Sequence, residues 1–517
     1  MPDRSTIAQC FPDQALAQGI AKKLKGDAGK TGEVLTSKDV NNTTRLFTES
    51  YLRPSSSIVS LQGLQVFTNL QWLNLDKTKV SDLSPLAKLT KLGDLWLSGT
   101  QVSDVSPLAK LANLQYLHLS GTQVSNVSPL AKLAKLDYLD LSNTQVSNVS
   151  PLAKLTNLKS LNLNGTQVSD VSSLAGLAKL GVLRLGDTKV SDVSPLAKLT
   201  NLGSLDLDKT QVSNVSSLAG LTELQHLDLS ETQVSDVSPL AKLTNLGFLD
   251  LSNTRVSDVS PLAKLAKLVS LCLSGTLVSD VSPLAKLTNL ESLDLYGTLV
   301  SDVSPLAGLT KLEYLDLYGT GVLDLSVLHG LSLYGGSTDT GTTSFAGVRP
   351  SAKLTVEGDG SVSMPAPRWL DGTWVAPSST SPAGGTLDAK RGVVTWKTYD
   401  PKASYSYDFK QSFTLKADGM SVEFSGRVSG VKPVAKTFAV VFDSAGGSSV
   451  ASQTVEYGAR AVAPKDPVRA GYVFQGWYTA KAGGSKYDFS KPVTGGLTLY
   501  ARWTPVPKTF TVSFDSA

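Results

Sequence analysis

The feature that most constrains this chain is a unit of 22 residues that recurs many times. LWLSGTQVSDVSPLAKL, residues 95–111, represents the unit, and later copies differ from it at few positions. The central leucine of its L-x-L segment falls at Leu73, Leu95, Leu117, Leu139, Leu161, Leu183, Leu205, Leu227, Leu249, Leu271, Leu293 and Leu315. A period between about 20 and 50 residues is the signature of a solenoid, in which each turn buries its apolar side chains against its neighbours.

Each unit contains a strand and a short helical segment. The pattern x-L-x-L-x alternates like a strand with one buried face, so the leucines point inward and the residues between them outward. Ser106 and Pro107 predict an N-cap serine followed by proline at the first helical position. Ser173 and Ser217 replace the proline in two units. We therefore predict an α/β, horseshoe-like leucine-rich-repeat solenoid with strands on its concave side.

The first turn of such a solenoid needs a cap. The segment FPDQALAQGIAKKL, residues 11–24, places apolar side chains at helical i, i+4 spacing from Leu16 onward. We assign residues 1–47 to a helical N-terminal cap. Residues 48–331 are assigned to twelve regular turns plus a degenerate first turn that contains Ile58.

The repeat LxLxxTxVSDVSPLAKLTNL, with the FPDQALA segment ahead of it, resembles the internalins, which are surface leucine-rich-repeat proteins of Gram-positive bacteria. All twelve turns carry threonine, from Thr78 to Thr320, where a general leucine-rich repeat has asparagine or cysteine. We expect this column of hydroxyl groups to bond with backbone groups of the loops.

Two further blocks continue the resemblance. Residues 392–428 are similar to the immunoglobulin-like domain that follows internalin repeats, and their aromatic residues alternate as in half-buried strands. Residues 437–503 are similar to the internalin B-repeat, a small ubiquitin-like, β-grasp-like module. The resemblance implies an all-β immunoglobulin-like domain at 332–435 and a B-repeat-like module at 436–505.

The last segment, 506–517, begins the B-repeat-like module again. TFTVSFDSA repeats TFAVVFDSA of residues 437–445, so we predict a second, truncated B-repeat and read the chain as a fragment of a longer protein.

Composition excludes several kinds of partner. The formal charge is only +4, which does not favour nucleic acid. No apolar run approaches the roughly 20 residues that span a bilayer, so membrane insertion is not expected. No export signal is visible in the sequence, and an extracellular or bacterial cell-surface location is what the resemblance implies.

The sequence contains no recognisable catalytic constellation. Its three histidines, His118, His226 and His329, accompany no nucleophile or phosphate-binding motif. Cys10 and Cys272 have no metal-ligand spacing around them. We therefore expect a non-enzymatic protein without a cofactor or metal.

Charged columns repeat along the array. Aspartate recurs between the two strand leucines, with Asp206, Asp228 and Asp250 on consecutive turns. These side chains either keep an exposed face soluble or form an acidic stripe for a basic partner or a cation. A lysine column in the convex segment, from Lys88 to Lys286, either steers a partner to the acidic side or only aids solubility.

Aromatic residues are the stronger sign of binding. Alternation points eight of them outward from the strand region: Trp72, Trp96, Tyr116, Tyr138, Phe248, Tyr296, Tyr314 and Tyr318. Exposed aromatic anchors are enriched among interface hot spots. Trp72 has an alternative, since in the first turn it could pack on the cap.

Two hypotheses on function result. The first is an adhesin-like binding protein whose concave face recognises a protein of a host or neighbouring cell. The second is a structural cell-envelope protein whose repeats bind glycan or serve as a spacer.

Overall fold

The computed structural model describes residues 3–47, 54–334, 343–357, 359–400, 402–415, 417, 420–431, 437–456 and 458–513. The chain divides into two compact units. One comprises residues 1–352 and 356–430, and the other comprises residues 353–355 and 431–517.

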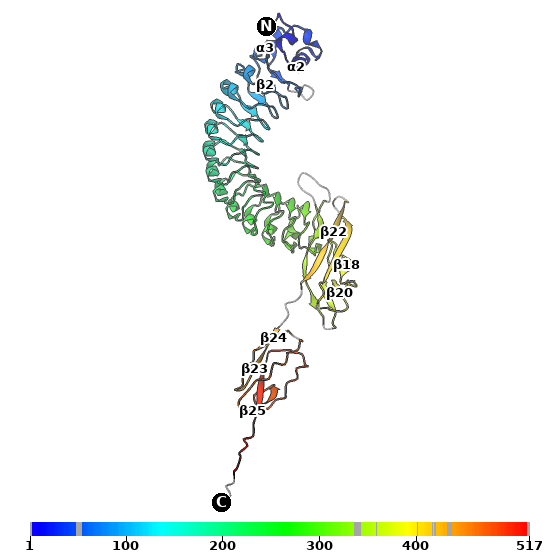
Figure 1. Cartoon of the computed structure of the whole chain (residues 1–517). Coiled ribbons are helices and arrows are strands. Elements are labelled where there is room, and N and C mark those ends of the chain that lie inside the picture. Colours follow the sequence, from blue (N-terminus) through cyan, green and yellow to red (C-terminus); the bar gives the residue numbers. More distant parts are fainter. Residues whose placement is uncertain are drawn as a thin grey trace. The chain divides into compact units, whose positions relative to one another are not determined.

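A parallel sheet of thirteen short strands runs through the first unit. Neighbouring strands pair leucine to leucine, for example Leu95 with Leu117. Figure 1 shows these strands on the inner side of a curved array, which confirms the predicted leucine-rich-repeat solenoid. The strands are β1 Arg45–Leu46, β2 Trp72–Asn74, β3 Asp94–Trp96, β4 Tyr116–His118, β5 Tyr138–Asp140, β6 Ser160–Asn162, β7 Val182–Arg184, β8 Ser204–Asp206, β9 His226–Asp228, β10 Phe248–Asp250, β11 Ser270–Cys272, β12 Ser292–Asp294 and β13 Tyr314–Asp316.

Short 3₁₀-helices form the convex side, from η3 (Leu64–Val66) through η5 (Ser106–Lys110) to η15 (Ser326–Leu328). The predicted serine cap is wrong. In η5 the N-cap residue is Val105, and its side chain makes no capping bond. Asp104 takes this role, because its Oδ1 accepts the N–H of Ser106 at 2.8 Å. Short aspartate side chains commonly accept the N–H two residues on.

The threonine column behaves as expected from the sequence. All twelve side chains are buried. Each hydroxyl donates to the carbonyl oxygen of the leucine three residues earlier, at 2.6 to 2.8 Å. The column therefore satisfies carbonyl groups at the end of every strand segment.

Helices precede the first turn: α1 Ile7–Cys10, α2 Gln14–Lys25, η1 Lys30–Gly32 and α3 Ser37–Asn42. Helix α2 starts later than predicted because Asp13 is its N-cap, and Asp13 Oδ1 accepts the N–H of Leu16 at 2.9 Å. The other carboxylate oxygen accepts the N–H groups of Val59 and Ser60 at 2.7 and 3.0 Å. One side chain thus joins the helix to the start of the repeats.

Two β-sheets follow the last turn. One has the order β14-β22-β21-β18, with β15 also pairing to β22, and the other has the order β16-β17-β20-β19. The hydroxyl of Tyr407 on β21 donates to the carbonyl of Pro365 on β17, which joins the two sheets through their buried faces. The strands are β14 Phe345–Val348, β15 Ser351–Lys353, β16 Thr355–Val356, β17 Val362–Pro365, β18 Pro377–Ser381, β19 Thr386–Asp388, β20 Val393–Trp396, β21 Ser406–Thr414 and β22 Ser421–Val431.

Backbone bonds connect these sheets to the repeats. Asp316 bridges to Ser344 just before β14, and Asp324 bridges to Arg368. The sandwich therefore continues the sheet beyond β13 and covers the end of the array.

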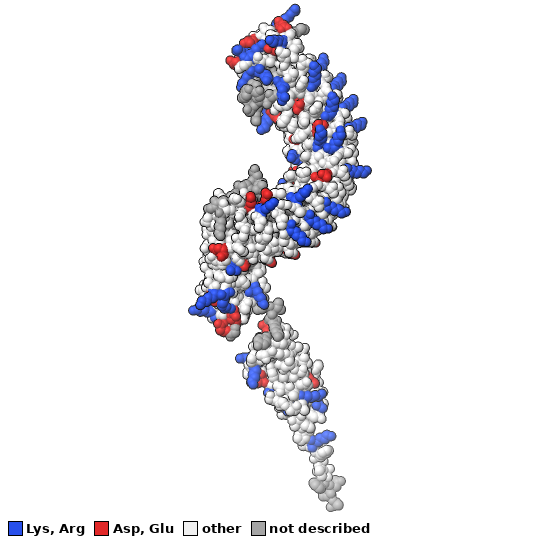
Figure 2. All heavy atoms as spheres, turned by 180° about the vertical axis from the view of Figure 1, so that it is seen from behind, with Lys and Arg blue, Asp and Glu red and all other residues white. Residues whose placement is uncertain are grey.

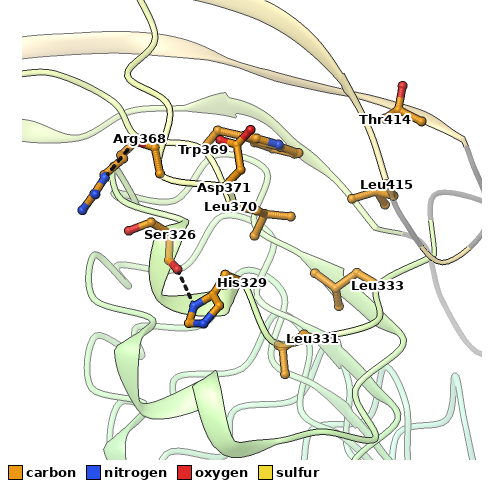
Figure 3. Close-up of a pocket in the computed structure, with 11 residues that line it drawn as sticks. Ser326, His329, Leu331, Leu333, Arg368, Trp369, Leu370, Asp371, Thr414 and Leu415 are labelled. Atoms are coloured by element: carbon orange, nitrogen blue, oxygen red, sulfur yellow. Dashed lines mark hydrogen bonds between the residues drawn. The ribbon is translucent and has the colours of Figure 1, made fainter. Parts of the chain in front are cut away.

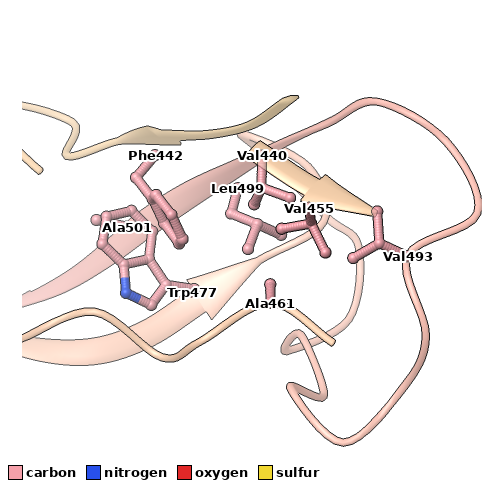
Figure 4. Close-up of a cluster of buried hydrophobic side chains, with 8 residues drawn as sticks. All are labelled: Val440, Phe442, Val455, Ala461, Trp477, Val493, Leu499 and Ala501. Atoms are coloured by element: carbon pink, nitrogen blue, oxygen red, sulfur yellow. The ribbon is translucent and has the colours of Figure 1, made fainter. Parts of the chain in front are cut away.

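The second unit contains a four-stranded mixed sheet. Its strands are β23 Thr437–Asp443, β24 Gln453–Glu456, β25 Tyr472–Tyr478 and β26 Leu497–Pro505, in the order β24-β23-β26-β25. Figure 4 shows the buried side chains between them, among which Phe442 lies edge-on to Trp477 with ring centroids 4.9 Å apart. Together with the sheets above, this module confirms the predicted all-β C-terminal part.

The predicted second B-repeat falls at the end of the described chain. Phe510 in this segment is 82% exposed. Residues 514–517 lie outside the described residues.

Candidate protein-binding surface

The strand register places outward side chains in columns on the concave face. In one column Trp72 stands beside Asp94, then Tyr116, and then Tyr138. The column between the strand leucines contains Trp96. Because adjacent strands lie about 4.8 Å apart, side chains on successive turns touch one another.

An aromatic cluster occupies the first turns. We define the N-terminal aromatic cluster as Trp72, Trp96, His118, Tyr138 and Tyr116. The Trp96 ring lies 3.8 Å from that of His118 and 6.2 Å from that of Trp72, centroid to centroid. His118 lies 4.6 Å from Tyr138, whose ring stacks at 6.4 Å on Tyr116. The four predicted aromatics are thus brought together by a histidine that the sequence did not assign to the site.

Stacking limits how much of each ring reaches solvent. Tyr116 is 40% exposed, whereas Trp96 and Tyr138 are half-buried. The Trp96 indole nitrogen is buried and has no hydrogen-bond partner among the described residues. Burial lowers the pKa of His118, and the nearby Asp140 opposes this shift. The predicted exposure of Trp96 is therefore only partial.

Trp72 contacts the N-terminal segment, which agrees with the alternative prediction that this side chain packs on the cap. The Arg45 guanidinium lies over its ring at 5.5 Å, and Arg45 pairs with Trp72 in the sheet. Part of this side chain therefore serves the packing of the first strand pair.

The predicted acidic column is half-buried rather than fully solvated. Oδ1 of Asp228 accepts the N–H and the hydroxyl of Ser230, at 2.9 and 2.6 Å. Asp250 bonds to Ser252 in the same way, and burial raises its pKa. Asp206 accepts the amide of Asn164 at 2.9 Å. These aspartates hold turns together as well as contributing negative charge.

Sequence reasoning missed Asp208. Burial, followed by its hydrogen bond and proximity to Asp206, raises the pKa of Asp208 to about 6. The Asp208 carboxylate can occupy its position because residue 186 is glycine. A Cβ at Gly186 would lie 1.8 Å from Asp208 Oδ1. Gly186 is the one glycine in a column otherwise filled by Ser, Asn, Asp and Tyr, which was a usable signal.

A second aromatic group lies near the last turns. Tyr296 and Tyr318 are 47% and 39% exposed and stack at 5.1 Å. The predicted exposure of Tyr314 is wrong, since it is 8% exposed and lies beside Tyr334. Phe248 is half-buried next to His226 in the middle of the array. Two further apolar side chains, Leu277 and Leu299, are 54% and 61% exposed and were not predicted.

A pocket of about 540 Å³ lies where the last turn meets the sandwich. Figure 3 shows that leucine side chains and Trp369 line it, with His329 Nδ1 directed at the carbonyl oxygen of Ser326, 3.1 Å away. Nothing in its lining resembles the aromatic columns of the concave face.

Two kinds of feature are absent from the described residues. They contain no group of three His, Cys, Asp or Glu side chains placed to hold a metal ion. Within the same residues, no helix has the length and apolar character that crossing a membrane requires.

Comparison with known families matches each part of the chain. The family described as "Leucine Rich repeats (2 copies)" matches in overlapping windows over 68–176, and again at 222–264 and 266–329. "LRR adjacent" matches 372–432, and the "Listeria-Bacteroides repeat domain" matches 438–502.

Several of the similar proteins are internalins of Listeria monocytogenes. Internalin H of serovar 1/2a is 35% identical over 146 residues, which are 28% of this chain and 25% of Internalin H. The matched part thus spans about a quarter of that relative. The functional domain of InlJ has a TM-score of 0.58 over 83% of this chain and 98% of its own, but at 17% identity it shows the fold alone.

The crystal structure of an internalin, InlF, from strain 4b F2365 is 32% identical to this chain, with a TM-score of 0.54. The similarity covers 61% of this chain and 98% of the InlF structure. With its repeats, the adjacent domain and the terminal repeat module, this chain belongs to the internalin-like leucine-rich-repeat proteins.

Proposed function

We propose that this protein is a secreted or surface-located, non-enzymatic binding protein that recognises a partner protein through the concave face of its repeats. The observation that carries the proposal is the pair of aromatic groups there, the N-terminal aromatic cluster and the stacked Tyr296 and Tyr318. Tyrosine and tryptophan are enriched in interface hot spots because they bury a large area at low conformational cost.

The way the rings are held supports the same function. Each ring of the N-terminal aromatic cluster leans on a ring of a neighbouring turn, and the turns are fixed by the sheet and by the buried threonine bonds. A surface that is ordered before binding loses less conformational entropy when a partner docks. The half-buried carboxylates Asp206, Asp228 and Asp250 lie between the two groups and favour a partner with basic side chains opposite them.

We also propose a role for each of the other parts of the chain. Residues 1–47 would cap the repeats of 48–331, and the modules at 332–435 and 436–505 would hold the array away from the surface that bears it. The partner would be a protein of a host or neighbouring cell.

Capture of surface proteins on the immobilised full chain tests the function. The variant Tyr116→Ala/Tyr296→Ala removes an exposed ring from each aromatic group without touching the leucine core. Hot-spot truncation typically costs about 2 kcal/mol, so each change should weaken binding about thirtyfold. Tyr472→Ala is the matched control, since this tyrosine is 37% exposed on β25, outside the repeats.

Equal affinity of the double variant and the control would move the partner site away from the concave face. The rival function is a spacer or glycan-binding protein of the cell envelope. A chain that captures no surface protein but binds purified glycans or cell wall would support that rival.

A further inference from the structure

A band of lysines, interrupted at one turn, lies on the side of the repeats opposite the strands. The first column is the residue four positions after the serine that opens each 3₁₀-helix, and the second column is the residue three positions later. Of eleven successive turns, ten carry at least one lysine, and only the turn with Gly220 and Glu223 carries none. All are exposed, and Figure 2 shows basic side chains along the outer edge of the array. We call this band the lysine ridge: Lys88, Lys91, Lys110, Lys132, Lys135, Lys154, Lys179, Lys198, Lys242, Lys264, Lys267, Lys286 and Lys311.

No carboxylate that the structure describes forms an ion pair with any lysine of the ridge. Five of them donate instead to a neutral asparagine side chain one turn earlier, at 2.7 to 2.8 Å. In one such pair, Lys135 Nζ donates to Asn113 Oδ1, while Asn113 Nδ2 donates to the carbonyl of Thr90. The asparagine thus links three turns and holds the ammonium group in place without cancelling its charge.

In eight of the eleven turns an aspartate precedes the helical segment, and in the other three an asparagine takes its place. Asp104 and its equivalents precede the segment, and their carboxylates accept N–H groups of serine, as Asp104 does from Ser106. Where both charges are present in a turn, the aspartate lies six or nine residues before the first lysine, on the other side of the helical segment. A ligand that lies along the ridge meets ammonium groups at contact distance.

We propose that the lysine ridge binds a linear polyanion in which phosphodiester groups repeat along a flexible chain, such as poly(glycerol phosphate). This site is independent of the partner proposed for the concave face. A compact ammonium group binds phosphate as a point charge and needs no fixed approach angle. A single phosphate would gain from one or two lysines, whereas a chain of them gains from many linked contacts.

The shape and composition of the ridge decide between kinds of polyanion. The ridge follows the convex side of a curved array (Figure 1), so a stiff duplex would touch only a few turns, while a flexible chain can follow it. Single-stranded nucleic acid is usually held by bases stacked on aromatic rings. The two columns consist of Lys, Asn, Gly and Glu and offer no aromatic ring.

Binding of poly(glycerol phosphate) to the full chain, titrated between 50 and 200 mM salt as is usual for such contacts, tests the proposal. The test variant is Lys88→Gln/Lys110→Gln/Lys132→Gln/Lys154→Gln. The control, Lys397→Gln/Lys402→Gln/Lys465→Gln/Lys481→Gln, removes the same charge from exposed positions outside the ridge. The test variant should bind at least about tenfold more weakly, and its salt dependence should fall by about 3 in log-log slope, at about 0.7 per lost contact.

The control variant and Tyr116→Ala/Tyr296→Ala should bind the polymer like the unmodified chain. Equal weakening of the test and control variants would show that only net charge matters and would overturn the proposal. So would absence of binding at 50 mM salt. Equally tight binding of a single-stranded RNA of the same charge would overturn the assignment to a polyol phosphate.

Discussion

Two neighbouring threonines allow a direct test of what the buried hydroxyl column contributes. The hydroxyl of Thr188 is the one described donor to the carbonyl of Leu185, at 2.6 Å. One turn later, the carbonyl of Leu207 accepts the hydroxyl of Thr210 at 2.7 Å and also its N–H at 3.3 Å. Both threonines are 5% exposed. Valine has nearly the shape of threonine, so substitution removes the donor without opening a cavity.

The expected costs differ because only one carbonyl loses every donor. Thr188→Val leaves a buried acceptor without a partner, which costs about 2 kcal/mol of unfolding free energy. Thr210→Val leaves the long N–H bond in place and should cost about 1 kcal/mol or less. Urea unfolding of the full chain, followed by circular dichroism, gives both values if the slope with urea is unchanged. Costs that agree within about 0.5 kcal/mol would refute this account of the column.

Three further predictions concern stability. Asp208 and Asp316 have pKa values of about 6, above the usual 3.8, mainly through burial, so their contribution to stability is full below about pH 4 and is lost as pH rises through about 6. The variant Asp208→Asn/Asp316→Asn should therefore gain more stability over the unmodified chain at pH 7 than at pH 5, and an equal gain at both would contradict the shifts. Glu231 has a φ of 54° where six other turns have glycine, so Glu231→Gly should stabilise the chain by about 1 kcal/mol in urea unfolding. Deletion of residues 1–47 should expose the leucines of the first turn and cause aggregation, and a monomer with unchanged melting temperature would argue against the cap.

The regular part of the fold was predictable because each turn solves the same local problem. Leucine alternation gave the strands, and the threonine column gave the buried hydroxyl bonds. The helical start was mispredicted at Ser106 because serine before proline is a common N-cap. The acceptor is Asp104, two residues earlier. The Asp-x-Ser pattern at the start of the segment was the sequence signal that favours Asp104, and not Ser106, as the acceptor.

The candidate surface was predictable in direction but not in exposure. Alternation sends Tyr314 and Trp96 outward correctly, yet neighbouring side chains decide how much of each ring solvent reaches. Tyr314 is covered because chain that follows the repeats returns beside it, with Tyr334 in contact and Ser344 paired to Asp316. Trp96 is partly covered by His118 of the next turn. The periodicity of a single strand predicts neither of these contacts, because each involves a residue from another part of the chain.

The two faces of the array differ in a way that bears on what each can bind. On the concave face the column that begins with Trp72 changes from turn to turn, through Asp94, Tyr116 and Tyr138 to Ser160 and Val182. A surface without internal repetition matches an irregular partner in one register, which is the property a protein interface needs. On the ridge nearly every turn presents the same ammonium group. Such a surface gives a non-repeating partner no preferred register, but it suits a ligand that is itself periodic. The two proposed sites thus assign a folded protein to one side of the same repeat and a polymer to the other.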